Sequence, residues 1–134
     1  MVSTPKQQRE RYNRRKANNL CVGCGKTAPI TDRVKCVRCS VKTIAYERTG
    51  AGTAHNIDSL LEKFTGVCAL SGLPIAIGVN AELDHIKPVS KYPELAHDVD
   101  NVQWVDVHVN FAKRDMDQDE FIAMCRRVAE VAEK

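Results

Sequence analysis

Apolar residues in the second half of the chain recur every three or four positions, a spacing typical of amphipathic helices. Residues 56–66 carry three apolar side chains on one helical face, behind a cap at Asn56 or Asp58. Near the end of the chain, Asp117 and Glu120 have the spacing of a capping box that opens a last helix. The expected buried side of this last helix consists of Phe121, Ile122, Cys125, Val128 and Val131.

Two short apolar runs in the same half lack helical spacing and predict β-strands. They are residues 83–86 and 102–105, and the prolines and charges between them predict a long loop. Short β elements are expected earlier, at residues 67–70 and 75–77. From Asp106 the apolar spacing becomes helical again, with Asp106 itself as the expected cap. The order strand, loop, strand and helix predicts an α+β fold.

The first 50 residues differ from the rest in pattern. Residues 5–19 contain good helix formers and no interior glycine or proline, yet they offer no apolar stripe to bury. We expect a helical arm that orders on nucleic acid. Residues 40–49 predict a short helix, and Gly50–Thr53 resembles a hinge. The chain is therefore expected to divide into residues 1–50, an arm with a cysteine module, and residues 51–134, a second domain.

Four cysteines in the first part form two C-x-x-C pairs separated by eleven residues. Each pair can hold one metal ion through two thiolates, and four thiolates make a closed tetrahedral zinc site. Disulfides or redox thiols are the alternative, but a cytosolic protein keeps its thiols reduced. We therefore expect a zinc knuckle with a structural Zn²⁺, held by Cys21, Cys24, Cys36 and Cys39.

Charge separates the two halves more sharply than the net charge of +3 suggests. Residues 1–50 hold twelve Lys or Arg against three acids, a net of +9, whereas residues 51–134 carry a net of −6. A basic head favours binding to phosphates, although a solvated charged helix is the simpler alternative. The side chains expected to contact DNA are Arg9, Arg11, Arg14, Arg15 and Lys16.

The residue types for phosphodiester hydrolysis gather between Asp84 and Lys113. Asp84 and the side-chain carbonyl of Asn110 are hard oxygen ligands suited to Mg²⁺. The neighbouring His85 has an imidazole that titrates near neutral pH and can accept a proton from water. Asn101, or its backbone carbonyl, can orient that ring. Lys113 lies one helical turn after Asn110, so both side chains can face the same phosphate.

These motifs, D-H-I-x-P-x-S, D-N-V-Q-W and N-x-x-K, resemble the ββα-metal core of HNH endonucleases, also called the His-Me finger. The resemblance covers residues 68–127 and implies a small ββα core flanked by helices, following the zinc module. It implies that His85 activates water, that Asp84 and Asn110 hold Mg²⁺, Mn²⁺ or another divalent ion, and that Asn101 orients His85.

The sequence departs from many HNH proteins in one respect. Their core often carries two further C-x-x-C pairs that bind zinc, whereas here the matching positions hold Cys68 with Ser71 and Asp106 with Val109. We therefore expect no zinc inside the core. Cys68 and Cys125 are expected to be buried apolar residues without a partner at metal spacing.

The sequence thus predicts a metal-dependent DNA endonuclease, a monomer or homodimer, of a kind common in phages and mobile elements. The alternative is a non-catalytic zinc-knuckle protein that binds nucleic acid. No apolar run approaches the roughly 18 residues of a membrane span, and the basic N-terminus lacks a signal-peptide core. We expect the protein in the cytosol of the host cell.

Overall fold

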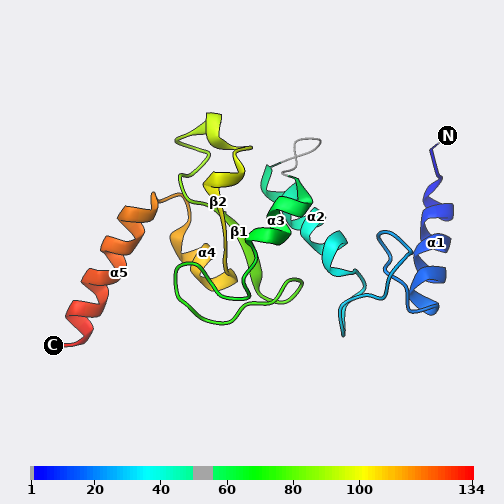
Figure 1. Ribbon diagram of the computed structural model, residues 1–134, viewed down its shortest axis with the longest axis horizontal. Helices are drawn as coiled ribbons and strands as arrows, with labels where there is room; N and C mark the ends of the chain where they lie inside the picture. The colour runs from blue at the N-terminus through cyan, green and yellow to red at the C-terminus, as the bar shows by residue number, and fades with distance from the viewer. Residues whose placement is uncertain (1, 50–55) are drawn as a thin grey trace.

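The computed structural model describes residues 2–49 and 56–134, and the hinge expected at Gly50–Thr53 lies outside them. The described part is a mixed α+β structure in which α1 lies at one end, α5 at the other and the sheet between them (Figure 1). The elements are α1 Pro5–Ala17, α2 Val37–Thr49, α3 Ile57–Lys63, β1 Ala81–His85, η1 Pro93–Leu95, η2 Val99–Asn101, β2 Val102–Asp106, α4 Val107–Lys113 and α5 Gln118–Ala132.

The sheet consists of β1 and β2, which pair antiparallel with Leu83 opposite Trp104 and Asp84 opposite Gln103. Both strands were predicted to within two residues. Helix α4 follows β2 directly. Asp106, the last residue of β2, caps the helix, because its carboxylate accepts a 2.8 Å hydrogen bond from the backbone N–H of His108. This confirms the predicted cap and the predicted order of strand, loop, strand and helix.

The hydrophobic core lies where the sheet meets α2 and α3. Trp104 is its largest member, and its indole N–H donates a 2.9 Å hydrogen bond to the carbonyl of Leu60 in α3. Phe64, just after α3, packs edge-on against the indole with ring centroids 5.4 Å apart. The buried cluster comprises Val41, Ala45, Leu60, Cys68, Ile75, Ile77, Ala81, Leu83, Val102, Trp104 and Val105.

Helix α2 connects the cysteine module to this core. Its first turn contains Cys39. Val41 and Ala45, in the second and third turns, are fully buried among side chains of the sheet and α3. The apolar residues of α2 therefore complete the core of the segment after residue 56. The domain boundary expected at residue 50 stays a prediction. Residues of α2, before this boundary, pack in one core with residues after it.

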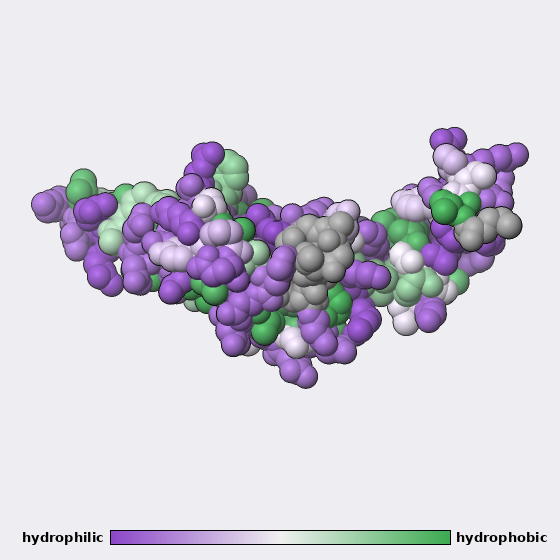
Figure 2. Space-filling view, turned by 90° about the horizontal axis from the view of Figure 1, so that it is seen from above, coloured by the Kyte–Doolittle hydropathy of each residue, from purple (hydrophilic) through white to green (hydrophobic). Residues whose placement is uncertain are grey.

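Helices α1 and α5 bury little. Thr4 and Gln7 form a capping box at the start of α1, and no residue of α1 is buried. In α5 only Phe121 is buried, and Val128 and Val131 are 63% and 70% exposed, so most of its expected buried side is wrong. Figure 2 shows apolar side chains at the surface at this end of the molecule.

Three smaller expectations also differ from the structure. Asp117 precedes α5 without a side-chain capping bond, so the predicted capping box does not form. Cys125 is exposed rather than buried, whereas Cys68 is buried as expected. In place of the two early β elements there is an isolated bridge between Val67 and Pro74. Across residues 2–49 and 56–134, no helix has the length and apolarity to cross a membrane.

Candidate functional site

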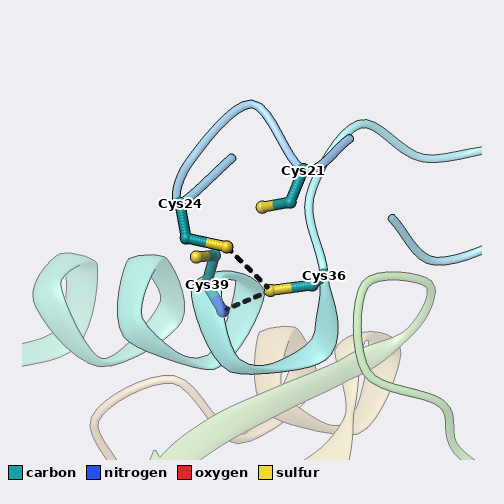
Figure 3. Close-up of side chains that lie close together, drawn as sticks. All are labelled: Cys21, Cys24, Cys36 and Cys39. Atoms are coloured by element: carbon teal, nitrogen blue, oxygen red, sulfur yellow. Dashed lines mark hydrogen bonds between the residues drawn. The ribbon is translucent and has the colours of Figure 1, made fainter. Parts of the chain in front are cut away.

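The four predicted zinc ligands come together in space. The sulfur atoms of Cys21, Cys24, Cys36 and Cys39 lie within 4.8 Å of one another, between the loop that carries Cys21 and Cys24 and the start of α2 (Figure 3). A tetrahedral zinc ion with Zn–S bonds of about 2.3 Å separates its sulfur ligands by about 3.8 Å. The 4.0 Å between the Sγ atoms of Cys24 and Cys36 is close to this value. The cluster therefore fits a structural zinc ion.

Backbone amides surround the cluster and favour thiolates. The N–H of Gly23 lies 3.3 Å from the sulfur of Cys21, and the N–H of Lys26 lies 3.5 Å from that of Cys24. Burial raises the pKa of Cys21, but N–H groups of Cys36, Cys24 and Gly23 outweigh it and lower this pKa to about 6.

The fourth thiol behaves differently, since burial and the neighbouring thiols raise the pKa of Cys39 to about 12. Four adjacent thiolates would repel one another, so the cluster by itself keeps a proton on Cys39. A divalent cation at the centre would remove this repulsion and favour loss of that proton.

Arg15 attaches the arm to the cysteine module. Its guanidinium donates hydrogen bonds of 3.0 and 3.1 Å to the carbonyls of Val22 and Gly23, between the first two zinc ligands. Gly25 has a φ of +67°, and a Cβ there would lie 2.6 Å from the Nε of Arg15, so a larger residue would push this contact apart. Arg15 is thus partly committed to the module.

The other four side chains predicted to contact DNA are exposed to solvent. They are the exposed residues Arg9, Arg11, Arg14 and Lys16.

A cleft of about 190 Å³ lies on the other side of the core, between α2, β1 and α4. We call it the His85 cleft. It brings together three of the predicted site residues, Asp84, His85 and Asn110, which belong to β1 and α4. The full lining is Arg48, Leu83, Asp84, His85, Pro88, Val89, Ser90, Asn110, Arg114 and Asp115.

Asp84 is buried and held by two partners. The ammonium of Lys113 lies 3.1 Å from the carboxylate, and Nε2 of Gln103 donates to Oδ2 at 3.0 Å. Oδ2 contacts both Gln103 and Lys113, whereas Oδ1 contacts Lys113 and keeps a second lone pair. Because Asp84 also lines the His85 cleft, its carboxylate can accept a further partner from the cleft, such as a divalent cation.

Lys113 differs from the expectation that it faces a phosphate. Its side chain is fully buried, and besides Asp84 it donates to the carbonyls of His85 at 2.8 Å and Ile86 at 3.5 Å. All three contacts lie at the end of β1, so Lys113 fixes the strand that carries the site. It is a positioning residue for Asp84 in this structure.

His85 lies at the end of β1 with its ring held from the loop. Its Nε2 lies 3.2 Å from the carbonyl of Ala96, which can only accept, so Nε2 is the donor in this contact. Burial lowers the pKa of His85 below its ordinary value of 6.5 and outweighs the opposing effects of the Ala96 carbonyl and Asp84. The imidazole is therefore neutral at pH 7.

Asn101 was expected to orient His85, and the structure places it in the loop beside the ring. Its amide accepts from the N–H of Lys87 at 2.9 Å and donates to the carbonyl of Lys87 at 3.0 Å and of Leu95 at 3.4 Å. Its backbone carbonyl accepts from Ile86 N–H at 2.8 Å. These bonds tie the chain after His85 to the segment that presents the Ala96 carbonyl. The role of Asn101 in orienting His85 stays a prediction.

Glu82 contacts two residues of the His85 cleft, although the sequence motifs do not include it. Its Oε2 accepts a 2.6 Å hydrogen bond from Nδ2 of Asn110 and also forms a 2.9 Å ion pair with Arg48 of α2. Since Nδ2 of Asn110 is used, its Oδ1 is the atom left to ligate a cation. Glu82 and Asp84 are two residues apart on a strand and share a face, which is the pattern that identifies Glu82 from sequence.

Two arginines supply positive charge to the His85 cleft in place of Lys113. Arg48 enters from the end of α2, and the exposed Arg114 ends α4 with a φ of +52°, a conformation that non-glycine residues rarely adopt. Their charges are opposed by Asp84 and Asp115 in the same lining. The cleft therefore combines hard oxygen donors, a neutral imidazole and two guanidinium groups.

No protein-family model matches this chain, and neither a curated protein nor a solved structure matches it. The geometry of the two sites therefore carries the functional argument.

Proposed function

We propose that this protein is a metal-dependent HNH endonuclease that hydrolyses phosphodiester bonds of DNA. The observation that carries the proposal is that Asn110 of α4 lines one cleft with the adjacent residues Asp84 and His85 of β1. The order and spacing of these residues resemble those of the HNH motif. The basic arm and the zinc knuckle would hold the nucleic acid.

Asp84 and Asn110 are the residues that would hold a divalent cation, because both line the His85 cleft, both carry side-chain oxygens and both are held by other residues. Mg²⁺ bound there would stabilise negative charge on the phosphate and on the leaving 3′ oxygen. Lys113 and Gln103 hold the carboxylate of Asp84, and Glu82 turns the amide of Asn110. The protein's own side chains thus preorganise the ligands.

His85 acts as general base in this proposal. Its ring lines the His85 cleft and is held at Nε2 by the Ala96 carbonyl, and in the reaction it would take a proton from the attacking water. The lowered pKa keeps the ring in the accepting form at neutral pH. Arg48 and Arg114, rather than the buried Lys113, are the cations available to the phosphate.

One observation favours the alternative, a zinc-knuckle protein that binds nucleic acid without cutting it. Lys113 already neutralises Asp84, so this carboxylate is stable without a divalent ion. The two functions differ in whether His85 and Mg²⁺ matter to the substrate.

A plasmid-nicking assay tests the proposal. The full-length protein with its zinc retained should nick supercoiled DNA when Mg²⁺ or Mn²⁺ is added, and His85→Ala should lower the rate about 10²- to 10⁴-fold with DNA binding unchanged. His97→Ala, in an exposed loop position outside the lining of the His85 cleft, is the matched control and should keep full activity. Wild-type protein that never nicks with either metal, or His85→Ala that nicks at the wild-type rate, would overturn the proposal.

A further inference from the structure

A second hollow of about 430 Å³ adjoins the His85 cleft, and we call it the Phe111 hollow. The two cavities share Arg48, Asn110 and Arg114, so a chain of nucleotides leaving the cleft would enter the hollow. The lining of the Phe111 hollow is Arg48, Glu82, Val107, Asn110, Phe111 and Arg114.

Phe111 is the unusual member of this lining. Its side chain is 77% exposed although it follows Asn110 directly in α4. Val107, Phe111 and Arg114 are spaced by four and three residues, so they lie along one helical face toward the hollow. Single exposed apolar residues are common on protein surfaces, but here the aromatic residue shares the lining of one hollow with two arginines and a predicted metal ligand.

The charges of the hollow suit a nucleotide. Arg48 and Arg114 line it, and Glu82 is the acidic residue in the same lining. Glu82 engages Arg48 through one nitrogen at 2.9 Å, and a guanidinium has five N–H donors, so others remain for a phosphate. An aromatic face for a base beside cations for the backbone is the combination that single-stranded nucleic acid binds.

We propose that the Phe111 hollow binds the nucleotide next to the scissile phosphate, with its base against the Phe111 ring and its phosphate against Arg114. This inference rests on the proposed function for the position of the scissile phosphate. In this inference Phe111 binds the substrate through a base, in addition to the contacts made to the sugar-phosphate backbone.

Binding to two matched probes tests the proposal. One probe is a single-stranded oligodeoxynucleotide, and the other has the same length with abasic tetrahydrofuran residues throughout, both measured by fluorescence anisotropy with the full chain in Ca²⁺. The wild type should bind the normal probe more tightly, and Phe111→Ala should lower this preference about 5- to 150-fold. Phe111→Trp should retain it. Tyr46→Ala removes an exposed aromatic on α2 outside the hollow and should leave the preference unchanged.

Arg114→Ala separates the phosphate contact from the base contact. It should weaken both probes equally and reduce the slope of log K against log salt by about 0.7, the value for one single-strand phosphate. The inference would be overturned if the wild type bound both probes equally, or if Phe111→Ala kept the wild-type preference for the normal probe.

Nicking of supercoiled plasmid by the same proteins distinguishes the two proposals. Nicking by the wild type with an unchanged base preference in Phe111→Ala would reject the hollow and leave the nuclease standing. A base preference that depends on Phe111 in a protein that never nicks would reject the nuclease and confirm the hollow as a binding site.

Discussion

Glu82 accepts a 2.6 Å hydrogen bond from the side-chain amide of Asn110, joining β1 to α4 at the edge of the His85 cleft. The bond determines which end of the Asn110 amide faces the cleft, because a carboxylate can only accept. The same carboxylate oxygen pairs with Arg48, so the end of α2 is tied to this contact. The orientation of a proposed metal ligand thus depends on residues from three elements.

Replacing Glu82 by Ala should weaken metal binding rather than the chemistry itself. Without its partner the Asn110 amide can turn, and loss of such an outer contact typically costs about 10- to 100-fold in metal affinity. The Mg²⁺ concentration for half-maximal nicking should rise by that factor, while the rate at saturating Mg²⁺ changes less. Glu130→Ala, at an exposed position on α5, is the control. An unchanged Mg²⁺ requirement in Glu82→Ala would contradict the role of Glu82.

Lys113→Met should destabilise the fold. It would leave the Asp84 carboxylate buried without its cation, and breaking a buried pair typically lowers the free energy of unfolding by about 3–5 kcal/mol. Lys91→Met removes one partner of the exposed pair with Glu120 and should cost less than about 1 kcal/mol. Urea unfolding followed by the fluorescence of Trp104, the single tryptophan, measures both. Equal losses in the two variants would show that Lys113 does not hold the site.

Removing zinc should disturb the core as well as the cysteine module. Cys39→Ser should release the metal, and because α2 carries both Cys39 and the buried Val41, Trp104 should unfold at a lower urea concentration. Cys125→Ser, which changes an exposed cysteine, should keep one zinc per chain and wild-type unfolding. Elemental analysis gives the metal content. Zinc that persists after all four ligands become Ser would place the metal elsewhere.

Two arginines of the arm should have separable effects. Arg11→Ala should reduce the slope of log K against log salt on duplex DNA by about 0.9, the value for one phosphate contact. Arg15→Ala should instead weaken zinc retention in the presence of a chelator, because Arg15 donates to the carbonyls of Val22 and Gly23. If Arg15→Ala changed only the salt slope, its role would be nucleic-acid contact alone.

Local patterns predicted much of this structure. The cysteine spacing correctly brought four sulfur atoms together, and the apolar runs located both strands and the helix after Asp106. Asp84 and Asn110 line one cleft because a short strand, a cap and one helical turn fix their positions, and their role as metal ligands stays a prediction. These features depend on residues that are neighbours in sequence or on one antiparallel pairing.

Other features depend on packing that no local pattern specifies. Lys113 lies on the same helix as Asn110, but its burial follows from the approach of α4 to the end of β1. The apolar face of α5 has helical spacing like that of a buried helix, yet no element of the described chain covers Val128 or Val131. Periodicity indicates that a face is apolar and says nothing of whether the same chain covers it.

The position of α2 also changes how a truncation should be designed. Deleting residues 1–50 would remove Val41 and Ala45 from the core together with the arm, so loss of activity could reflect unfolding. Deleting residues 2–14 removes most of α1 but retains Arg15, the cysteine module and α2, and it therefore isolates the contribution of the arm to binding.

Helix α2 also sets the distance between the cysteine cluster and the His85 cleft. A rise of about 1.5 Å per residue places Arg48 about 14 Å along the axis from Cys39, which corresponds to about four base-pair steps of duplex DNA. Because both ends of this helix are anchored, one in the cysteine cluster and one through Glu82, the interval is rigid. Nicks should therefore fall at a constant offset from the footprint of the zinc knuckle, whatever sequence lies beneath either.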